Sequence, residues 1–436
     1  MSRELRKRRV PTYRVTRSLR IESTSVGPVF SWVDPRKRDR VHAPASPLDL
    51  LAVAVAQGRL SPFQAAWKGG ATLEALYATL SRLDRKGVLH APPTLLRRDP
   101  ARFPYAGDDS VCTVTAAPFQ WHITSDCDMN CRHCYDREAR VTLPLEEALR
   151  TLDQIEQFCE RHWIAGSIVF TGGNPFLHPG FLELYAEAVR RGFPVVVLGN
   201  PVRREQVEKL CEIRKPDCYQ ISLEGLREHN DWVRGPGSFD RGVRFLDVLR
   251  ALGVPSCVMM TYTRANLDQA LPLTRVLEGR ADAFAGTPLS QVGSGAALDA
   301  PEPEAYRRFL YDWVAEARHN PALCLKDNLT NLVEQEQGGS RCGGCCTPYG
   351  CAAAFDAPVL LPDGEVHACR RLPSLLGNLR DMALEDIYQS EAAQRYRRGL
   401  SACDGCELLP RCGGCLAQAR GASRDPYCWK HRNRVT

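Results

Sequence analysis

Three cysteines within eight residues, Cys127, Cys131 and Cys134, follow the predicted strand Phe119–Thr124. Three closely spaced thiolates can hold three irons of a [4Fe–4S] cluster and leave the fourth iron without a protein ligand. An iron with an open position can bind a small molecule, so such a site is reactive as well as structural. A zinc site is the alternative, although zinc usually takes four protein ligands in structural sites.

The segment from residue 118 to residue 300 alternates strands with helices. The expected strands are Phe119–Thr124, Ser167–Phe170, Val195–Leu198, Tyr219–Leu223, Ser256–Thr261 and Ala281–Ala285. Helices such as Leu145–Arg161 and Phe181–Arg191 separate them. A βα repeat predicts a parallel sheet covered by helices, and six units are fewer than the eight of a closed barrel.

The cysteine triplet and this repeat resemble the radical S-adenosylmethionine (radical SAM) family, in which an aromatic residue such as Tyr135 often follows the third cysteine. The resemblance implies an α/β fold with a partial (β/α)6 barrel, open on one side to admit a large substrate. It also implies that the open iron chelates SAM, and that one electron from the reduced cluster cleaves SAM into methionine and a 5′-deoxyadenosyl radical. Cys127, Cys131 and Cys134 would then be the catalytic, metal-binding cysteines.

Other segments at strand ends resemble the SAM-binding motifs of that family. Residues 172–175, Gly-Gly-Asn-Pro, resemble the GGEP motif that binds the SAM amino group, with an uncharged amide in place of the glutamate. Three further segments resemble those that meet the ribose, the carboxylate and the adenine of SAM. The candidate cofactor-binding residues are Tyr135, Gly172, Gly173, Asn174, Pro175, Ser222, Glu224, Arg234 and Leu289.

Ten of the nineteen cysteines lie beyond residue 340, in a segment with little periodicity that we expect to bury little apolar core. Their spacing from Cys351 to Cys428 resembles the SPASM domain, although one short gap is two residues instead of three. The resemblance implies two auxiliary clusters, and therefore three [4Fe–4S] clusters in all. The implied ligands are Cys345, Cys351, Cys369 and Cys415 for the first auxiliary cluster, with Cys342 or Cys346 as substitutes for Cys345, and Cys403, Cys406, Cys412 and Cys428 for the second.

The N-terminal region predicts strands and three helices of winged-helix size. The expected elements are strands at Val29–Val33, Arg40–His42 and Val88–His90, and helices at Pro47–Gln57, Pro62–Trp67 and Leu73–Lys86, with Ser46 and Thr72 as caps. The region also resembles the peptide-recognition domains of peptide-modifying radical SAM enzymes, in which a leader peptide adds a strand to the sheet. A DNA-binding winged helix and an inert cap are the alternatives.

These patterns divide the chain into five parts. We expect a basic tail and winged-helix-like domain (1–95), a linker (96–117), the partial barrel (118–300), a helical bridge (301–339) and the SPASM domain (340–436).

The first twenty residues carry eight basic residues and one acidic residue, so the rest of the chain is nearly neutral and nucleic acid binding is not expected. No apolar run reaches the length of a membrane span, and cysteine ligation fits a reducing, cytoplasmic location.

As a whole, the resemblance implies a radical SAM/SPASM oxidoreductase that matures a ribosomally made precursor peptide (RiPP maturation). The product would be a thioether or carbon–carbon cross-link, or a related change at Cα or Cβ. The implied partners are the precursor peptide with its leader and an electron donor such as flavodoxin or ferredoxin. One alternative is a formylglycine-type sulfatase maturase, although Arg370 stands where those enzymes place an aspartate base. Another is an iron–sulfur redox-sensing winged-helix regulator, which the series of SAM-pocket motifs disfavours.

Overall fold

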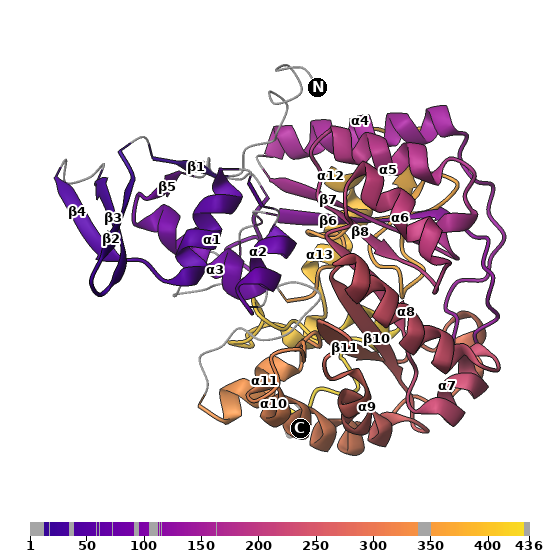
Figure 1. Ribbon diagram of the computed structural model, residues 1–436. Helices are drawn as coiled ribbons and strands as arrows, with labels where there is room; N and C mark the ends of the chain where they lie inside the picture. The colour runs from indigo at the N-terminus through magenta and orange to yellow at the C-terminus, as the bar shows by residue number, and fades with distance from the viewer. Residues whose placement is uncertain are drawn as a thin grey trace.

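The computed structural model describes residues 13–430 apart from 17, 35–38, 58, 61, 72, 91–95, 104–111, 113, 115, 163 and 339–349. Within these residues, a small N-terminal domain lies beside a larger body built on one nine-stranded sheet (Figure 1). No helix in the described residues is long and apolar enough to cross a membrane.

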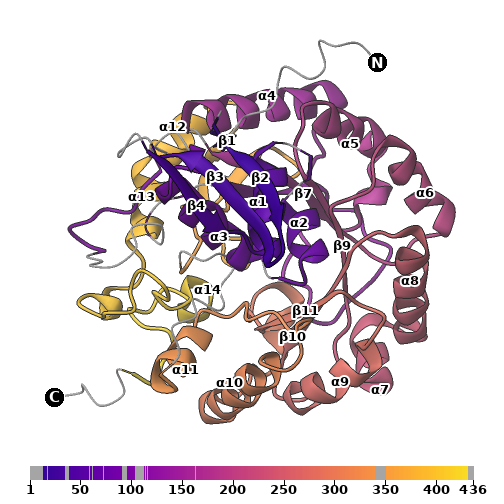
Figure 2. The same ribbon diagram turned by 60° about the vertical axis from the view of Figure 1, so that its left-hand side comes forward.

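Six parallel strands form most of the large sheet, in the order in which they occur along the chain. They are β6 (Ala116–Thr124), β7 (Ala165–Gly172), β8 (Val195–Leu198), β9 (Cys218–Ser222), β10 (Ser256–Tyr262) and β11 (Ala283–Pro288). The outer helices are α4 (Leu145–His162), α5 (Phe181–Arg190), α6 (Arg204–Ile213), α7 (Arg227–Arg234), α8 (Ser238–Leu252) and α9 (Ala270–Leu277), which ring the sheet in Figure 2. The predicted α/β fold is confirmed, with β11 beginning two residues later than expected.

Alternate side chains of each strand face the helices. On β9, Tyr219 and Ile221 are buried, whereas Cys218, Gln220 and Ser222 are half-buried on the opposite face. The ring of Tyr219 lies 5.0 Å from that of Phe245 on α8. The apolar core therefore fills the layer between strands and helices, and the inner face of the sheet keeps polar side chains and partial exposure.

The C-terminal segment extends the same sheet. Strand β12 (Val359–Leu360) pairs in parallel with β6, and β13 (Glu365–His367) and β14 (Leu375–Asn378) follow in antiparallel order. Leu360, Val366 and Ile387 are buried in the main core. The expectation that this segment buries little apolar core is therefore wrong, because its short strands join the barrel sheet instead of standing alone.

Two helices precede these strands along the chain, and three follow them. α10 (Pro303–Ala317) and α11 (Thr330–Glu336) precede the hairpin, and α12 (Leu384–Gln389), α13 (Glu391–Arg398) and α14 (Leu416–Ala419) follow it. The ring of Tyr388 on α12 lies 5.1 Å from that of Phe158 on α4. The C-terminal helix α12 thus packs on the first helix of the barrel.

The N-terminal domain consists of a three-stranded antiparallel sheet followed by three helices. Its elements are β2 (Arg20–Thr24), β3 (Gly27–Val33), β4 (Arg40–Pro44), α1 (Pro47–Ala56), α2 (Pro62–Lys68) and α3 (Leu73–Arg85), with β1 (Arg14–Val15) paired to β5 (Leu89–His90). The Ser46 hydroxyl accepts the backbone N–H of Asp49, which confirms the predicted cap of α1. Thr72, the other predicted cap, lies outside the described residues.

A side-chain hydrogen bond joins the N-terminal domain to the barrel. Nε1 of Trp67 on α2 donates to Oδ1 of Asp282 at 2.8 Å. The other carboxylate oxygen of Asp282 accepts the backbone N–H of Ser256 at 2.7 Å. Asp282 and Ser256 lie where β11 and β10 begin, so this contact is at the amino end of the strands, opposite the end that carries the cysteine loop.

Candidate functional site

The three cysteines of the triplet lie on the loop between β6 and α4, at the carboxyl end of the sheet. Cys127 is exposed, and Cys131 and Cys134 are half-buried. Burial raises the pKa of Cys131, and the neighbouring thiols of Cys127 and Cys134 contribute to the rise. The three thiols are therefore close enough to interact, which fits the donor set of one iron–sulfur cluster.

The Gly172-Gly173 pair closes against this loop. The N–H of Gly173 donates to the carbonyl of Thr124 at 2.9 Å, and that of Asn174 donates to the carbonyl of Asp126 at 2.7 Å. A Cβ atom on Gly172 would lie 2.1 Å from the Thr124 oxygen, and one on Gly173 would lie 2.0 Å from the Asp126 oxygen. The two glycines therefore leave room for the backbone of the cysteine loop.

A network of buried amides continues from Asn174 to the next strand. Asp128, within the cysteine loop, accepts hydrogen bonds from the side-chain N–H groups of Asn174 (3.1 Å) and Asn200 (2.6 Å). Asn200 follows β8, and its Oδ1 atom accepts from Arg234 at 3.1 Å. The side chain of Asn174 also caps the short helix that begins at Pro175. Asn174, Asn200 and Arg234 are buried, so these contacts anchor the exposed Asp128 and its loop to buried side chains.

Glu224, two residues past the end of β9, is 1% exposed and fully engaged. Its Oε1 atom lies 3.2 Å from Nε2 of His133 and 3.4 Å from Nη1 of Arg234, and its Oε2 atom accepts the N–H of Thr261 at 2.8 Å. Burial raises the pKa of Glu224, but His133 and Arg234 outweigh it and hold the pKa below its usual value. Ser222 ends β9 on the half-buried inner face.

The segment after β11 supports the loop from the other side. The N–H of Ser294 donates to the carbonyl of Cys134 at 2.8 Å, and Gly293 has a φ of +56° where a Cβ atom would lie 2.5 Å from the Tyr135 oxygen. Leu289 is buried, and its N–H donates to the carbonyl of Tyr262 at 2.8 Å. The predicted adenine-contacting segment therefore packs beside the cysteine loop.

The described C-terminal cysteines of each predicted set influence one another's pKa. Burial raises the pKa of Cys415, and the thiols of Cys351 and Cys369 add to the rise. Burial raises the pKa of Cys403 to about 12, with a contribution from Cys428 and Cys406, and Cys412 responds to Cys403 and Cys428. Cys342, Cys345 and Cys346 lie outside the described residues. In the described part of the chain, no three potential ligands converge closely enough for a single metal ion.

Tyr135 directly follows the third cysteine of the triplet. Burial raises its pKa to about 12, with smaller contributions from charges that include Cys134 and Cys369. Its ring lies 6.2 Å from the ring of His122 on β6. The aromatic residue after the third cysteine thus packs where the barrel meets the C-terminal segment.

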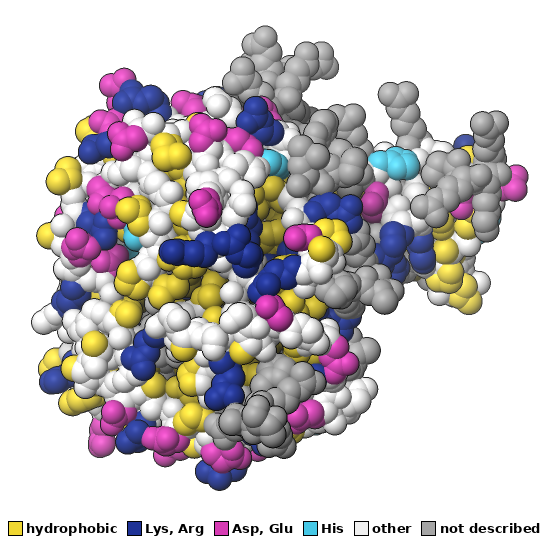
Figure 3. Space-filling view, turned by 180° about the vertical axis from the view of Figure 1, so that it is seen from behind, with side chains coloured by type: hydrophobic (Ala, Val, Ile, Leu, Met, Phe, Trp, Pro, Cys, Tyr) yellow, Lys and Arg dark blue, Asp and Glu magenta, His cyan; other side chains and the backbone are white. Residues whose placement is uncertain are grey.

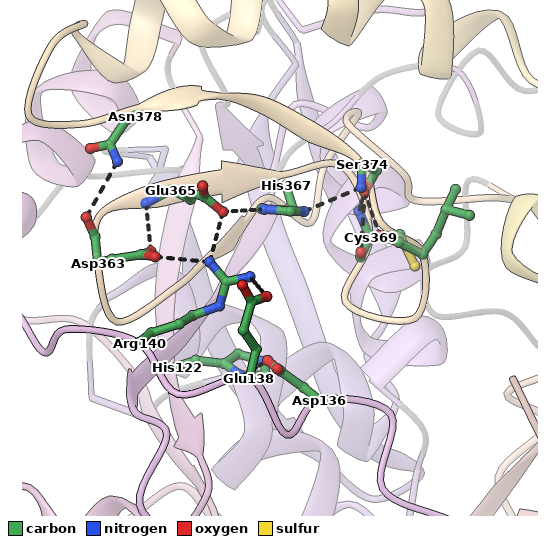
Figure 4. Close-up of polar contacts among 11 residues, drawn as sticks. His122, Asp136, Glu138, Arg140, Asp363, Glu365, His367, Cys369, Ser374 and Asn378 are labelled. Atoms are coloured by element: carbon green, nitrogen blue, oxygen red, sulfur yellow. Dashed lines mark hydrogen bonds and ion pairs between the residues drawn. The ribbon is translucent and has the colours of Figure 1, made fainter. Parts of the chain in front are cut away.

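Figure 4 shows a continuous chain of polar contacts from the cysteine loop to Cys369. Arg140 donates to Asp363 and Glu365 at 2.8 Å each, and Glu365 lies 2.9 Å from Nε2 of His367. Nδ1 of His367 accepts the N–H of Ser374 at 3.2 Å, and the Ser374 hydroxyl accepts the N–H of Cys369 at 3.1 Å. The two cysteine regions are therefore joined by side chains as well as by the sheet.

Sequence reasoning missed several of these residues. Asp128 and His133 lie inside the triplet, and Asn200 follows a predicted strand. Their positions as polar residues after strands could have identified them from the sequence. Arg140 and His367 carried no signal, because their partners come from segments that are far apart in the sequence.

Two sequence models match the chain. One describes the radical SAM superfamily and matches residues 121–271, and the other describes an iron–sulfur cluster-binding domain, SPASM, and matches residues 351–416. Mycofactocin maturase MftC of Mycolicibacterium smegmatis is 30% identical over 314 residues, which are 68% of this chain and 77% of that protein. The AdoMet-dependent heme synthase of Methanosarcina barkeri is 27% identical over 72% of this chain and 97% of that protein.

Solved structures share the fold. Streptococcus suis SuiB bound to precursor peptide SuiA aligns with a TM-score of 0.60 and 15% identity, over 95% of this chain and 98% of that one. The enzyme anSMEcpe with bound AdoMet and the Cp18Cys peptide aligns with a TM-score of 0.55 and 17% identity, over 72% of this chain and 94% of that one. The chain belongs to the radical SAM superfamily. It is a radical SAM enzyme with a C-terminal SPASM domain.

Proposed function

We propose that this enzyme oxidatively modifies a ribosomally made precursor peptide, by a thioether or carbon–carbon cross-link or a related change at Cα or Cβ. The observation that carries the proposal is the N-terminal domain, a small sheet and three helices fixed to the amino end of the barrel. The likeness to peptide-bound SuiB over 95% of the chain and the 30% identity to MftC support it.

The cysteines would hold three [4Fe–4S] clusters. The cluster held by the first set would, together with SAM, supply the 5′-deoxyadenosyl radical that removes a hydrogen atom from the substrate. The first set is Cys127, Cys131 and Cys134, the second is Cys345, Cys351, Cys369 and Cys415, and the third is Cys403, Cys406, Cys412 and Cys428. The mutual influence of the described thiols on their pKa values supports each set.

The residues around the triplet would form the SAM pocket. Asn174 and Arg234 stay fixed by Asp128, Asn200 and Glu224, so they are oriented before any ligand arrives. The segments at Gly172–Pro175, Ser222 and Leu289 would complete the pocket from three strand ends. Tyr135 would close the side toward the C-terminal segment.

The edge of the N-terminal sheet would bind the leader of the precursor peptide. Strand β2 is an edge strand, and its residues are exposed. The side chain of Ile21 on this strand is 50% exposed, and that of Val26 in the turn after it is 92% exposed. An exposed edge with apolar side chains is a template for an added strand. Figure 3 shows the face of the molecule turned away from the viewer in Figure 1, where Lys and Arg side chains lie across a band of hydrophobic ones. Such a mixed basic and apolar surface would suit a peptide.

A flavodoxin or ferredoxin in the cytoplasm would supply electrons.

The direct test is mass spectrometry of candidate peptides. The anaerobically reconstituted enzyme would be incubated with SAM, dithionite and short peptides encoded beside its gene. We expect 5′-deoxyadenosine together with a peptide that has lost hydrogen. An Ile21→Asp variant should bind and modify the peptide less, whereas Ile213→Asp, at an exposed apolar residue of α6, should not. Cleavage of SAM with every such peptide left unmodified would refute the proposal.

Heme formation is the second candidate, favoured by the match to nearly the full length of the AdoMet-dependent heme synthase. Incubation of the same preparation with an iron-porphyrin precursor, followed by absorption spectroscopy of extracted pigments, decides between them. Heme formation would replace the peptide proposal.

A further inference from the structure

Arg371 contacts the second cysteine set and the end of a barrel strand at the same time. Its Nη2 atom donates a hydrogen bond to the sulfur of Cys415 at 3.2 Å. Its Nη1 atom donates to the carbonyl of Pro288, the last residue of β11, at 3.3 Å. A planar guanidinium presents donors on two nitrogens in a fixed fork, so one side chain can satisfy both acceptors.

The surroundings hold this guanidinium in place. Gln418, three residues after Cys415, donates to the carbonyls of Pro288 (3.1 Å) and Leu289 (3.2 Å), so two side chains join the same strand end. Asp425 accepts the N–H of Cys415 at 2.8 Å and is one of the carboxylates that the Arg371 charge faces. Cys415 therefore has a positive donor on its sulfur and an acidic acceptor on its backbone.

The reduction potential of an iron–sulfur cluster depends on hydrogen bonds to its sulfurs, on nearby charge and on exposure. Reduction adds one electron to the cluster and no proton, so it increases the negative charge on the cysteine sulfurs. A charge-assisted N–H donor stabilises that charge more strongly than a neutral donor. A cationic donor on Cys415 should therefore favour the reduced state.

We propose that Arg371 raises the reduction potential of the auxiliary cluster held by Cys351, Cys369 and Cys415, and that it fixes this cluster against the end of β11. The inference rests on the proposed cluster set. Arg371 is in this view a tuning and positioning residue, because its contact is with a cluster ligand. A cluster tuned in this way is a better acceptor for the electron that an oxidised substrate releases.

The test is an EPR-monitored redox titration of the reconstituted holoenzyme, with dithionite as the chemical reductant. The signal of this cluster is the one that Cys415→Ser alters. In Arg371→Met, we expect the equilibrium constant for reduction to fall at least tenfold, which is a shift of about 59 mV to lower potential for one electron. Arg371→Lys keeps the charge but not the planar fork of donors. Its midpoint potential should lie between those of the wild type and Arg371→Met.

Arg370→Met is the matched control. It removes the neighbouring positive charge, but Arg370 donates no hydrogen bond to a sulfur within the described residues. Its shift should be less than half of that in Arg371→Met. Equal shifts in the two variants would mean that charge alone acts, and they would overturn the proposed role of the hydrogen bond.

Two further outcomes separate this inference from the proposed function. An unchanged midpoint in Arg371→Met with unchanged iron content would overturn the inference while the cluster set stands. Iron content and EPR signals that are unaffected by Cys415→Ser would instead refute the cluster set. If Arg371→Met loses iron, the midpoint potential would be measured in Arg371→Gln instead. A midpoint potential equal to that of the wild type in Arg371→Gln would also overturn the inference.

Discussion

The carboxylate of Glu224 lies 3.2 Å from Nε2 of His133, so the end of β9 holds the residue between the second and third cysteines of the triplet. Arg234 completes this buried group at 3.4 Å from the same oxygen. The cysteine loop is therefore held by a carboxylate that is almost wholly buried.

Glu224→Ala should destabilise the protein and loosen the loop. Removal of one partner of a buried ion pair typically costs about 3–5 kcal/mol, because the other charge is left uncompensated. We expect a lower urea midpoint and a lower affinity for SAM, measured by denaturation and by equilibrium binding. Glu278→Ala, at an exposed glutamate, is the control. Equal midpoints for the two variants would contradict this account.

Alanine at Gly172 or Gly173 should prevent the cysteine loop from closing. The added Cβ atom would lie about 2 Å from a backbone oxygen of residue 124 or 126, and backbone cannot move aside as a flexible side chain can. Iron content after reconstitution should fall by about a third if three clusters are bound. Gly279→Ala introduces a residue at a φ of +65° with nothing within 4 Å of the Cβ position, so it controls for backbone strain alone. Full iron content in Gly173→Ala would refute the prediction.

His122 should make the protein sensitive to acid. Burial lowers the pKa of His122 to about 3, and the charges of Arg370, His367 and Arg140 act in the same direction. An unfolded histidine has a pKa of about 6.5, so below that pH the unfolded chain binds more protons than the folded one. Stability should therefore be complete above about pH 6.5 and fall with decreasing pH, by up to about 1.4 kcal/mol per pH unit.

Urea denaturation at several pH values between about 5 and 7 tests this expectation, because this range includes the pKa of about 6.5 of a histidine in the unfolded chain. His122→Gln should lose less stability between the two ends of that range than the wild type does. His319→Gln, at an exposed histidine, should follow the wild type. A His122→Gln profile parallel to the wild type would show that another group is responsible.

Arg140→Met should separate the cysteine loop from the C-terminal hairpin. Arg140 donates to Glu138, Asp363 and Glu365, and without it two half-buried carboxylates would face each other with no positive charge between them. We expect faster hydrogen exchange in residues 125–143 and in β13, measured by mass spectrometry on the reconstituted enzyme. Arg150→Met, at an exposed arginine of α4, should leave both segments unchanged. Unchanged exchange in both variants would show that the sheet alone holds the hairpin.

The barrel could be predicted from the sequence because its signals are local. The sequence predicts a strand at Val195–Leu198, where β8 lies, because a short apolar run between two helices is typical of a buried strand. The glycines at 172 and 173 were found as a motif, but their physical role was not, because it depends on how closely two strand ends approach. That distance is set by the fold and not by either segment.

The C-terminal hairpin could not be predicted for a related reason. Strand β12 has only two residues, Val359 and Leu360, which show no periodicity, and its partner β6 ends more than two hundred residues earlier. The cysteine spacing suggested the chemistry of this segment but not its place in the sheet. The polar chain from Arg140 to Cys369 follows from that placement, so it was also beyond sequence reasoning.

The parallel pairing of β12 with β6 has a consequence for how the protein is made. More than half of the chain lies between the partners Gln120 and Val359, so β6 emerges from the ribosome long before its neighbour exists. Until residue 359 is synthesised, one side of β6 is an open, apolar sheet edge, which is the kind of surface that promotes aggregation. Contacts of such long range also slow folding. Production of this enzyme in cells should therefore respond to chaperone supply and to slower, cooler synthesis, and a chain that stops before residue 350 should be recovered mainly as insoluble protein.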